Sequence, residues 1–130
     1  MKIGDSFEVR HTVVQADTAE ALGSGGLAVL ATPRLTALME NAAFTLLQDG
    51  LPEGKSSVGI NLNVSHVSPT PVGMEIRVTA EITEIAENGK TVDFKVTGFD
   101  AAGLIGEGTH RRAVIDTQRF LAKCQSKLNS

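Results

Sequence analysis

One stretch of the chain places apolar residues at helical spacing around most of its circumference. Leu35, Leu38, Met39, Ala42 and Leu46 recur at intervals of three and four residues, as in the buried stripe of a helix. The Thr-Pro pair at 32–33 favours a helix start and the Asp-Gly pair at 49–50 favours an end. Further apolar residues flank the stripe, so the predicted helix needs cover on most of its sides.

Most of the remaining chain alternates apolar and polar residues with a period of two, which indicates strands. Strands are expected at residues 7–14, 58–66, 74–83, 92–96 and 104–115. Asn88-Gly89 is a strong hairpin signal, and a terminal helix is expected at 117–128 with Phe120, Leu121 and Cys124 on one side. The predicted fold is therefore α+β, with one domain at 1–130. A curved antiparallel sheet wraps around one long central helix, and a short C-terminal helix follows.

Two polar residues stand inside these apolar stretches, Glu40 in the helix and His66 at the end of a strand. A titratable group in a packed layer costs free energy unless something pairs with it. Thr32, Thr36 and Glu40 follow one another at a spacing of four, along a stripe that flanks the apolar helix face. By parity, His66 shares the apolar face of its strand with Val58, Ile60, Leu62 and Val64. Helix and strand could thus bring Thr32, Glu40 and His66 together, with Glu40 and His66 as an acid–base pair.

Each of these residues also has a purely structural explanation. Glu40 could be a solvated helix residue, His66 a satisfied strand end and Thr32 only the N-cap of its helix. His11 and His110 are expected to be structural or surface residues.

Three residues could contact a ligand. Gly59 permits a close approach of backbone to a small group. With two residues per repeat, Gly59 falls on the opposite face of the strand from His66. Either a β-bulge intervenes or only the backbone of Gly59 matters. Arg111 and Arg112 form the densest positive spot on the chain and could meet phosphates, with a solvated strand end as the alternative.

Composition excludes several classes of protein. The net charge is −3 with no basic block, which disfavours nucleic-acid binding. No stretch is long enough to span a membrane, and Cys124 is the only cysteine, so we expect a cytoplasmic protein. The sequence has no nucleotide-cofactor motif and no metal-ligand spacing, so neither a cofactor nor a metal is expected.

The chain resembles the hotdog-fold acyl-CoA thioesterases, and most closely the fluoroacetyl-CoA thioesterase-like group. The resemblance covers roughly residues 28–115. It rests on four segments, at 31–43, 57–66, 69–73 and 106–115.

This resemblance implies a curved sheet around a long helix, and a homodimer, or a dimer of dimers, with sites at the subunit interface. The catalytic residues of the family fall on Thr32, Glu40 and His66, and its substrate-contacting glycine falls on Gly59. The family's phenylalanine lid has no counterpart in residues 23–27, which read Gly-Ser-Gly-Gly-Leu. Selectivity for a fluorinated acyl group is therefore not predicted.

The expected function is hydrolysis of an acyl-CoA thioester to a free acid and coenzyme A. His66 would act as general base on water or on the Thr32 hydroxyl, and Glu40 would orient His66 or attack directly. Two alternatives remain at this point: a hotdog enoyl- or hydroxyacyl-CoA hydratase, and a non-catalytic module that binds acyl thioesters.

Overall fold

The computed structural model describes residues 1–129 and contains one five-stranded antiparallel sheet. The strands are β1 (Ser6–Thr12), β2 (Lys55–His66), β3 (Glu75–Ile85), β4 (Thr91–Asp100) and β5 (Gly103–Asp116), in the spatial order β1-β3-β4-β5-β2. The helices are α1 (Ala19–Leu22), α2 (Thr32–Asp49) and α3 (Thr117–Gln125), with 3₁₀ turns η1 (Gln15–Asp17) and η2 (Ser126–Asn129). β2 and β1 are thus the two edges of the sheet.

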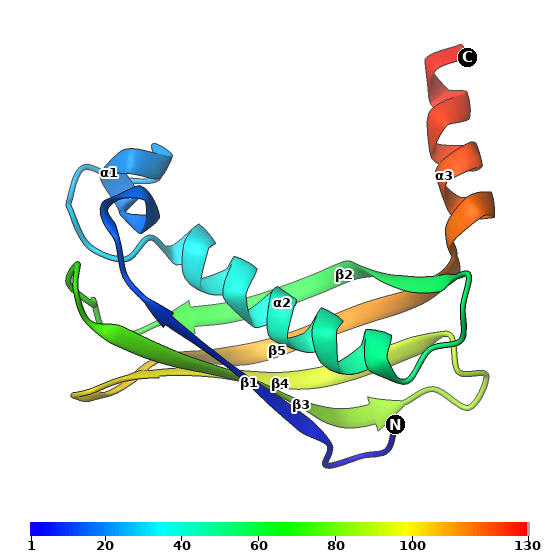
Figure 1. Cartoon of the computed structure of the whole chain (residues 1–130), viewed down its shortest axis with the longest axis horizontal. Coiled ribbons are helices and arrows are strands. Elements are labelled where there is room, and N and C mark those ends of the chain that lie inside the picture. Colours follow the sequence, from blue (N-terminus) through cyan, green and yellow to red (C-terminus); the bar gives the residue numbers. More distant parts are fainter. Residues whose placement is uncertain (130) are drawn as a thin grey trace.

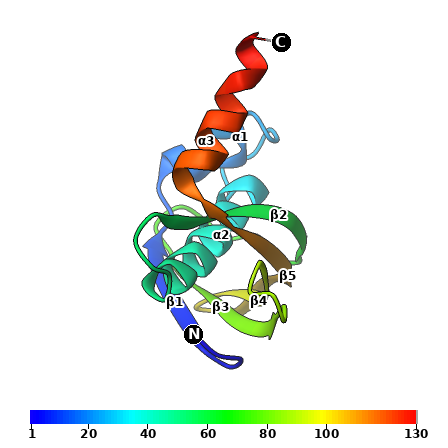
Figure 2. The same cartoon turned by 90° about the vertical axis from the view of Figure 1, so that its right-hand side faces the viewer.

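Helix α2 lies across the concave face of the sheet, as the sequence predicts (Figure 1). Seen end on, the strands curve around it from β1 to β2 (Figure 2). Leu35, Met39, Ala42, Ala43 and Leu47 of α2 are fully buried. They meet one apolar face of the sheet, made of Ile76, Val78, Ala80, Ile82, Val92, Phe94, Val96 and Ile105. Burial of this shared face is the main force that holds the helix in the sheet.

A β-bulge in β2 decides which of its side chains face the helix. The pairing of β2 with β5 shifts between Gly59 and Asn61, so that Ile60 is an extra residue. Gly59 is opposite Arg112 and His66 is opposite Gly106, and both lie on the concave face. The sequence allows two explanations for Gly59, a β-bulge or a role for its backbone alone. The bulge is present, and it brings Gly59 to the face of His66. The prediction that Val58 and Ile60 share the face of His66 is wrong, and Ile60 is 53% exposed.

The segment before α2 carries a short helix and a 3₁₀ turn that the pattern did not predict. Asp17 of η1 is buried and accepts hydrogen bonds from the Val14 backbone (2.8 Å), His11 Nε2 (2.7 Å) and Arg34 Nε (2.9 Å). Its own carbonyl accepts a hydrogen bond from the amide of Ala31. Asp17 thereby ties strand β1 to the first turn of α2, the end of the helix that carries Thr32.

The terminal helix continues β5 and extends away from the sheet (Figure 1). The prediction of a helix at 117–128 is confirmed, with the last residues in η2 rather than in α3. Phe120, Leu121 and Cys124 are all exposed. Among residues 1–129, no helix is long and apolar enough to cross a membrane.

We expect Asp17→Ala to destabilise the protein by about 1–3 kcal/mol, because it removes the buried acceptor of three hydrogen bonds, while the Arg34 side chain keeps partial access to water. Burial by itself would raise the pKa of the Asp17 carboxyl, but its hydrogen bonds outweigh burial and hold the pKa below 3.8. The stabilisation is therefore complete above the pKa of the unfolded chain and is lost as the pH falls through the folded value. Urea unfolding at several pH values measures it. The exposed Glu20→Ala is the control; equal stability of the two variants at pH 7 would contradict the role of Asp17.

Candidate functional site

The first contact of the candidate site joins the start of α2 to the end of β2. Thr32 Oγ1 lies 2.7 Å from His66 Nδ1. The helix N-cap is Ala31, without a side-chain cap hydrogen bond, and the proline stands in the first turn. The interpretation of Thr32 as a simple N-cap is therefore wrong, because its hydroxyl is directed to the imidazole.

The other ring nitrogen of His66 has no partner. Nε2 is buried and makes no hydrogen bond to any group among residues 1–129. Burial lowers the pKa of His66 below its ordinary value of 6.5, an effect only partly opposed by the nearby backbone of Ser68. The imidazole is therefore neutral at pH 7 and can accept a proton. Thr32 and His66 both line a cavity of about 280 Å³, whose other walls come from residues 19–30 and 67–69.

A second cluster surrounds Glu40, in the middle of α2. A Cβ atom added to Gly59 would lie 2.9 Å from Glu40 Oε2, 3.1 Å from His110 Cε1 and 3.4 Å from Arg112 Nη1. The absence of a side chain at Gly59 therefore lets the carboxylate of Glu40 approach β2. The negative charge of Glu40 acts on both His110 and Arg112, where it raises each pKa against the larger, lowering effect of burial.

Arg112 is held rigidly although it is charged and only 7% exposed. Its Nε donates to Ser57 Oγ (2.8 Å) and its Nη2 donates to the Ser57 carbonyl (3.0 Å). His110 Nδ1 donates to the Asn61 carbonyl, so its Nε2 can accept from Arg112 Nη1 at 3.2 Å. The guanidinium also lies over the Phe44 ring, 5.7 Å from its centre. Three of its five N–H groups are thus used, which leaves two for Glu40 or a ligand.

The two arginines do not form one positive spot. Successive residues of a strand point to opposite faces, and Arg111 is exposed on the convex face, where its Nε donates to Asp93 Oδ1 at 2.6 Å. The alternative of a solvated strand end describes Arg111 and not Arg112. His110 is structural, as expected, but its contact with Arg112 makes it part of the Glu40 cluster, which the sequence did not indicate.

Glu40 and His66 do not meet within one chain. Glu40 lies beside Gly59, and Gly59 is seven residues before His66 on β2. At the usual rise of a strand that separation is about 20 Å. The predicted convergence is therefore found for Thr32 and His66, while Glu40 belongs to a separate cluster on the same strand.

Comparisons with known proteins show what kind of protein carries this arrangement. The family model described as fluoroacetyl-CoA-specific thioesterase matches residues 13–118. The chain belongs to this thioesterase family. The fluoroacetyl-CoA thioesterase of Streptantibioticus cattleyicolor is 36% identical over 99 residues, which are 76% of this chain and 70% of that protein.

Solved structures of a fluoroacetyl-CoA thioesterase agree over nearly the whole chain. One has a TM-score of 0.90 at 33% identity and covers 98% of this chain and 97% of the other. A threonine-to-serine variant in complex with acetyl-CoA has a TM-score of 0.91 at 31% identity, with 98% of each chain covered. A hot-dog-like protein from Thermanaerovibrio acidaminovorans, at 21% identity, TM-score 0.89 and coverage of 98% and 93%, shares the fold. The predicted hotdog fold and thioesterase class are therefore confirmed.

Within residues 1–129, no three His, Cys, Asp or Glu side chains lie where they could hold a metal ion.

We expect Gly59→Ala to lower thioesterase kcat/KM by about 10²-fold, because the added methyl group displaces the Glu40 carboxylate and a misplacement of about 1 Å has an effect of that size. A thiol-release assay measures it. Gly26→Ala is the matched control, since a Cβ there meets no atom within 4 Å. Equal activity of the two variants would contradict the role assigned to Gly59.

Proposed function

We propose that the protein hydrolyses the thioester bond of an acyl-CoA at two equivalent sites of a homodimer. Each site would combine Thr32 and His66 of one subunit with Glu40, Gly59 and Arg112 of the partner subunit. The observation that carries the proposal is the separation of the two clusters along β2 in a chain of the thioesterase family.

The exposed edge of β2 supports the dimer. Native sheets protect long edge strands with charged residues, proline or short length. β2 has twelve residues and no Asp, Glu, Lys or Arg after Lys55, and Ile60 at its bulge is 53% exposed. The other edge strand, β1, carries Glu8 and Arg10 on an exposed surface. This contrast favours β2 as the strand that pairs with a second copy.

A two-fold axis near the middle of β2 would complete the site. With Ile60 as an extra residue in each strand, antiparallel pairing of two β2 strands about a two-fold axis at Asn63 puts Gly59 of the partner subunit opposite His66. Both residues lie on the concave face, as direct cross-strand partners must. Glu40 of the partner subunit would then come close to Nε2 of His66, the buried nitrogen that lacks a partner. Buried polar atoms of native proteins nearly always have such a partner.

In the dimer, Thr32, His66 and Glu40 of the partner subunit would form a hydroxyl–imidazole–carboxylate triad. His66 would take the Thr32 hydroxyl proton through Nδ1 as Thr32 Oγ1 attacks the thioester carbonyl, and the collapsing tetrahedral adduct would expel the coenzyme A thiolate, which takes that proton. Water, activated by the same imidazole, would then hydrolyse the acyl-threonine ester. Glu40 of the partner subunit would hold the ring and stabilise its imidazolium form. In an alternative route, water activated by His66 would attack the thioester directly, with the same groups in place. Mass spectrometry separates the two routes, because only attack by Thr32 gives an acyl-enzyme that can be trapped.

The binding residues would act around this centre. Arg112 of the partner subunit has two unused N–H groups that could stabilise the carbonyl oxygen as its charge develops. The positive end of the α2 dipole favours the same charge. A cavity of about 280 Å³ beside Thr32 and His66 suits a short acyl group. Arg111 remains a predicted phosphate contact on the convex face.

The exposed, free Cys124 fits a reducing compartment, which supports a cytoplasmic location.

The test is thiol release from a panel of short- and medium-chain acyl-CoAs by the wild type, His66→Ala and Glu40→Gln. We expect both variants to lose at least about 10²-fold in kcat, as is typical for a general base and its support. Removing the carboxylate should also lower the pKa of His66 further, so the acidic limb of the Glu40→Gln profile moves to lower pH. The mechanism needs neutral imidazole, so activity falls on the acid side.

Gln125→Glu, at an exposed position on α3, is the control with an altered charge, and it should keep both the rate and the pH profile. Near-normal turnover by His66→Ala and Glu40→Gln would overturn the proposal. Loss of enoyl absorbance from crotonyl-CoA without thiol release would indicate a hydratase. Tight binding of acyl-CoA without turnover by the wild type would indicate a binding module.

A further inference from the structure

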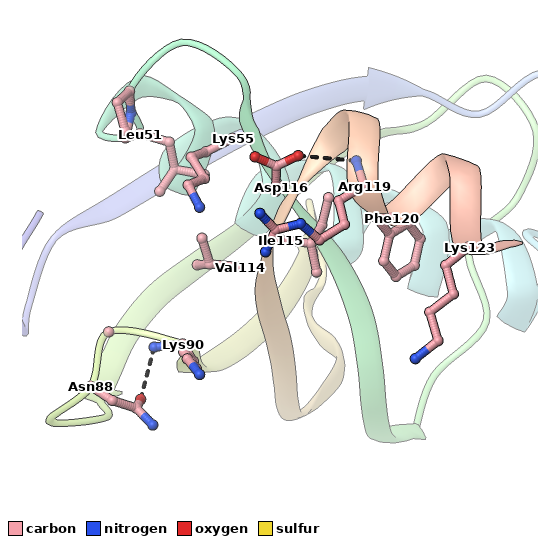
Figure 3. Close-up of a pocket in the computed structure, with 12 residues that line it drawn as sticks. Leu51, Lys55, Asn88, Lys90, Val114, Ile115, Asp116, Arg119, Phe120 and Lys123 are labelled. Carbon is pink, nitrogen blue, oxygen red and sulfur yellow. Dashed lines mark hydrogen bonds between the residues drawn. The ribbon is translucent and has the colours of Figure 1, made fainter.

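A cavity of about 530 Å³ lies at the far end of β2 and β5 from His66, where α3 leaves the sheet (Figure 3). Its walls come from five places in the chain: the loop after α2, the start of β2, the β3–β4 turn, the end of β5 and the first turns of α3. The residues that line it are Leu51, Pro52, Lys55, Asn88, Gly89, Lys90, Val114, Ile115, Asp116, Arg119, Phe120 and Lys123.

The lining is strongly basic in an acidic protein. Lys55, Lys90, Arg119 and Lys123 are four of the twelve Lys and Arg residues, whereas Asp116 is one of fifteen Asp and Glu residues. Figure 3 shows the side chains of Lys55 and Arg119 pointing toward one another. Among residues 1–129 none of these four cations forms an ion pair within 4.0 Å.

The fold gives no reason for this concentration of charge. Asp116 accepts a hydrogen bond from the Arg119 amide at 3.0 Å and caps α3. Its carboxylate also attracts the charges of Arg119 and Lys55, but one negative charge balances only one of the four positive charges in the lining. Cations gathered from three segments repel one another, and a bound anion with several charges would reverse that effect.

The cavity also has an apolar wall that a simple phosphate would not need. Phe120 is 40% exposed, and Leu51 and Val114 also line the cavity. Exposed aromatic rings beside cationic groups are the combination that binds a base together with its phosphates.

The cavity lies within reach of the proposed reaction centre. Lys55 in its wall is four residues from Gly59 on the same strand, about 13 Å at the usual rise. The pantetheine arm of coenzyme A spans about 15 Å when extended, by comparison with a peptide of the same number of backbone bonds.

We propose that this cavity binds the 3′-phosphorylated ADP part of coenzyme A, with the phosphates held by Lys55, Lys90, Arg119 and Lys123 and the adenine packed against Phe120. The assignment of coenzyme A rests on the proposed function. The recognition itself requires only a nucleotide with several phosphates.

Titration calorimetry with adenosine 3′,5′-bisphosphate tests the cavity without any turnover. We expect Lys90→Glu/Lys123→Glu to weaken binding by at least about tenfold, the effect of one charge-assisted hydrogen bond. Lys2→Glu/Lys95→Glu makes the same total charge change at two exposed positions outside the cavity and should bind as the wild type does. Phe120→Ala should weaken binding, whereas Leu121→Ala, its exposed neighbour outside the lining, should not. Equal binding by wild type and both cavity variants would overturn the proposal.

Kinetics then connect the cavity to the reaction. The double variant should raise KM for acetyl-CoA by about tenfold or more at unchanged kcat, and leave acetyl-pantetheine hydrolysis unaltered. Equal rises in KM for both substrates would overturn the assignment. If the wild type hydrolyses neither substrate, the thioesterase proposal fails, and the calorimetry still decides whether the cavity is a nucleotide site.

Discussion

The contact between Thr32 and His66 joins the first turn of α2 to the last residue of β2, and the rest of the site depends on it. From this contact α2 runs back along β2, and Glu40, eight residues later in the helix, lies beside Gly59, seven residues before His66. The geometry of the two elements thus separates the acid from the base within each chain.

Several buried polar groups keep this arrangement in place. Asp17 fixes the start of α2 through His11, Val14 and Arg34. Arg112 is fixed by Ser57 and His110, so its charge stays close to that of Glu40. Such groups are costly to bury and become strongly unfavourable if one partner is removed. They make the positions of the catalytic candidates rigid rather than the core more stable.

Local patterns predicted most of the fold and much less of the site. The helical stripe at 35–47 and the alternation in the strands depend on nearest neighbours in sequence, and both are confirmed. The inner-face assignment of Ile60 failed because a bulge shifts the register by one residue, and only the pairing with β5 reveals it. The same long-range pairing brings Ser57 to Arg112, a contact across 55 residues that no local pattern indicates. The predicted meeting of Glu40 and His66 has its explanation beyond one chain, in the proposed dimer.

Mixing two inactive variants tests the shared site most directly. His66→Ala and Glu40→Ala are each expected to be inactive, because each removes one half of both sites in a homodimer. Random reassortment of their subunits makes half of the dimers mixed, and each mixed dimer has one intact site of two. The account predicts that the refolded or co-expressed mixture regains about a quarter of wild-type thioesterase activity. A mixture no more active than its two components would contradict it.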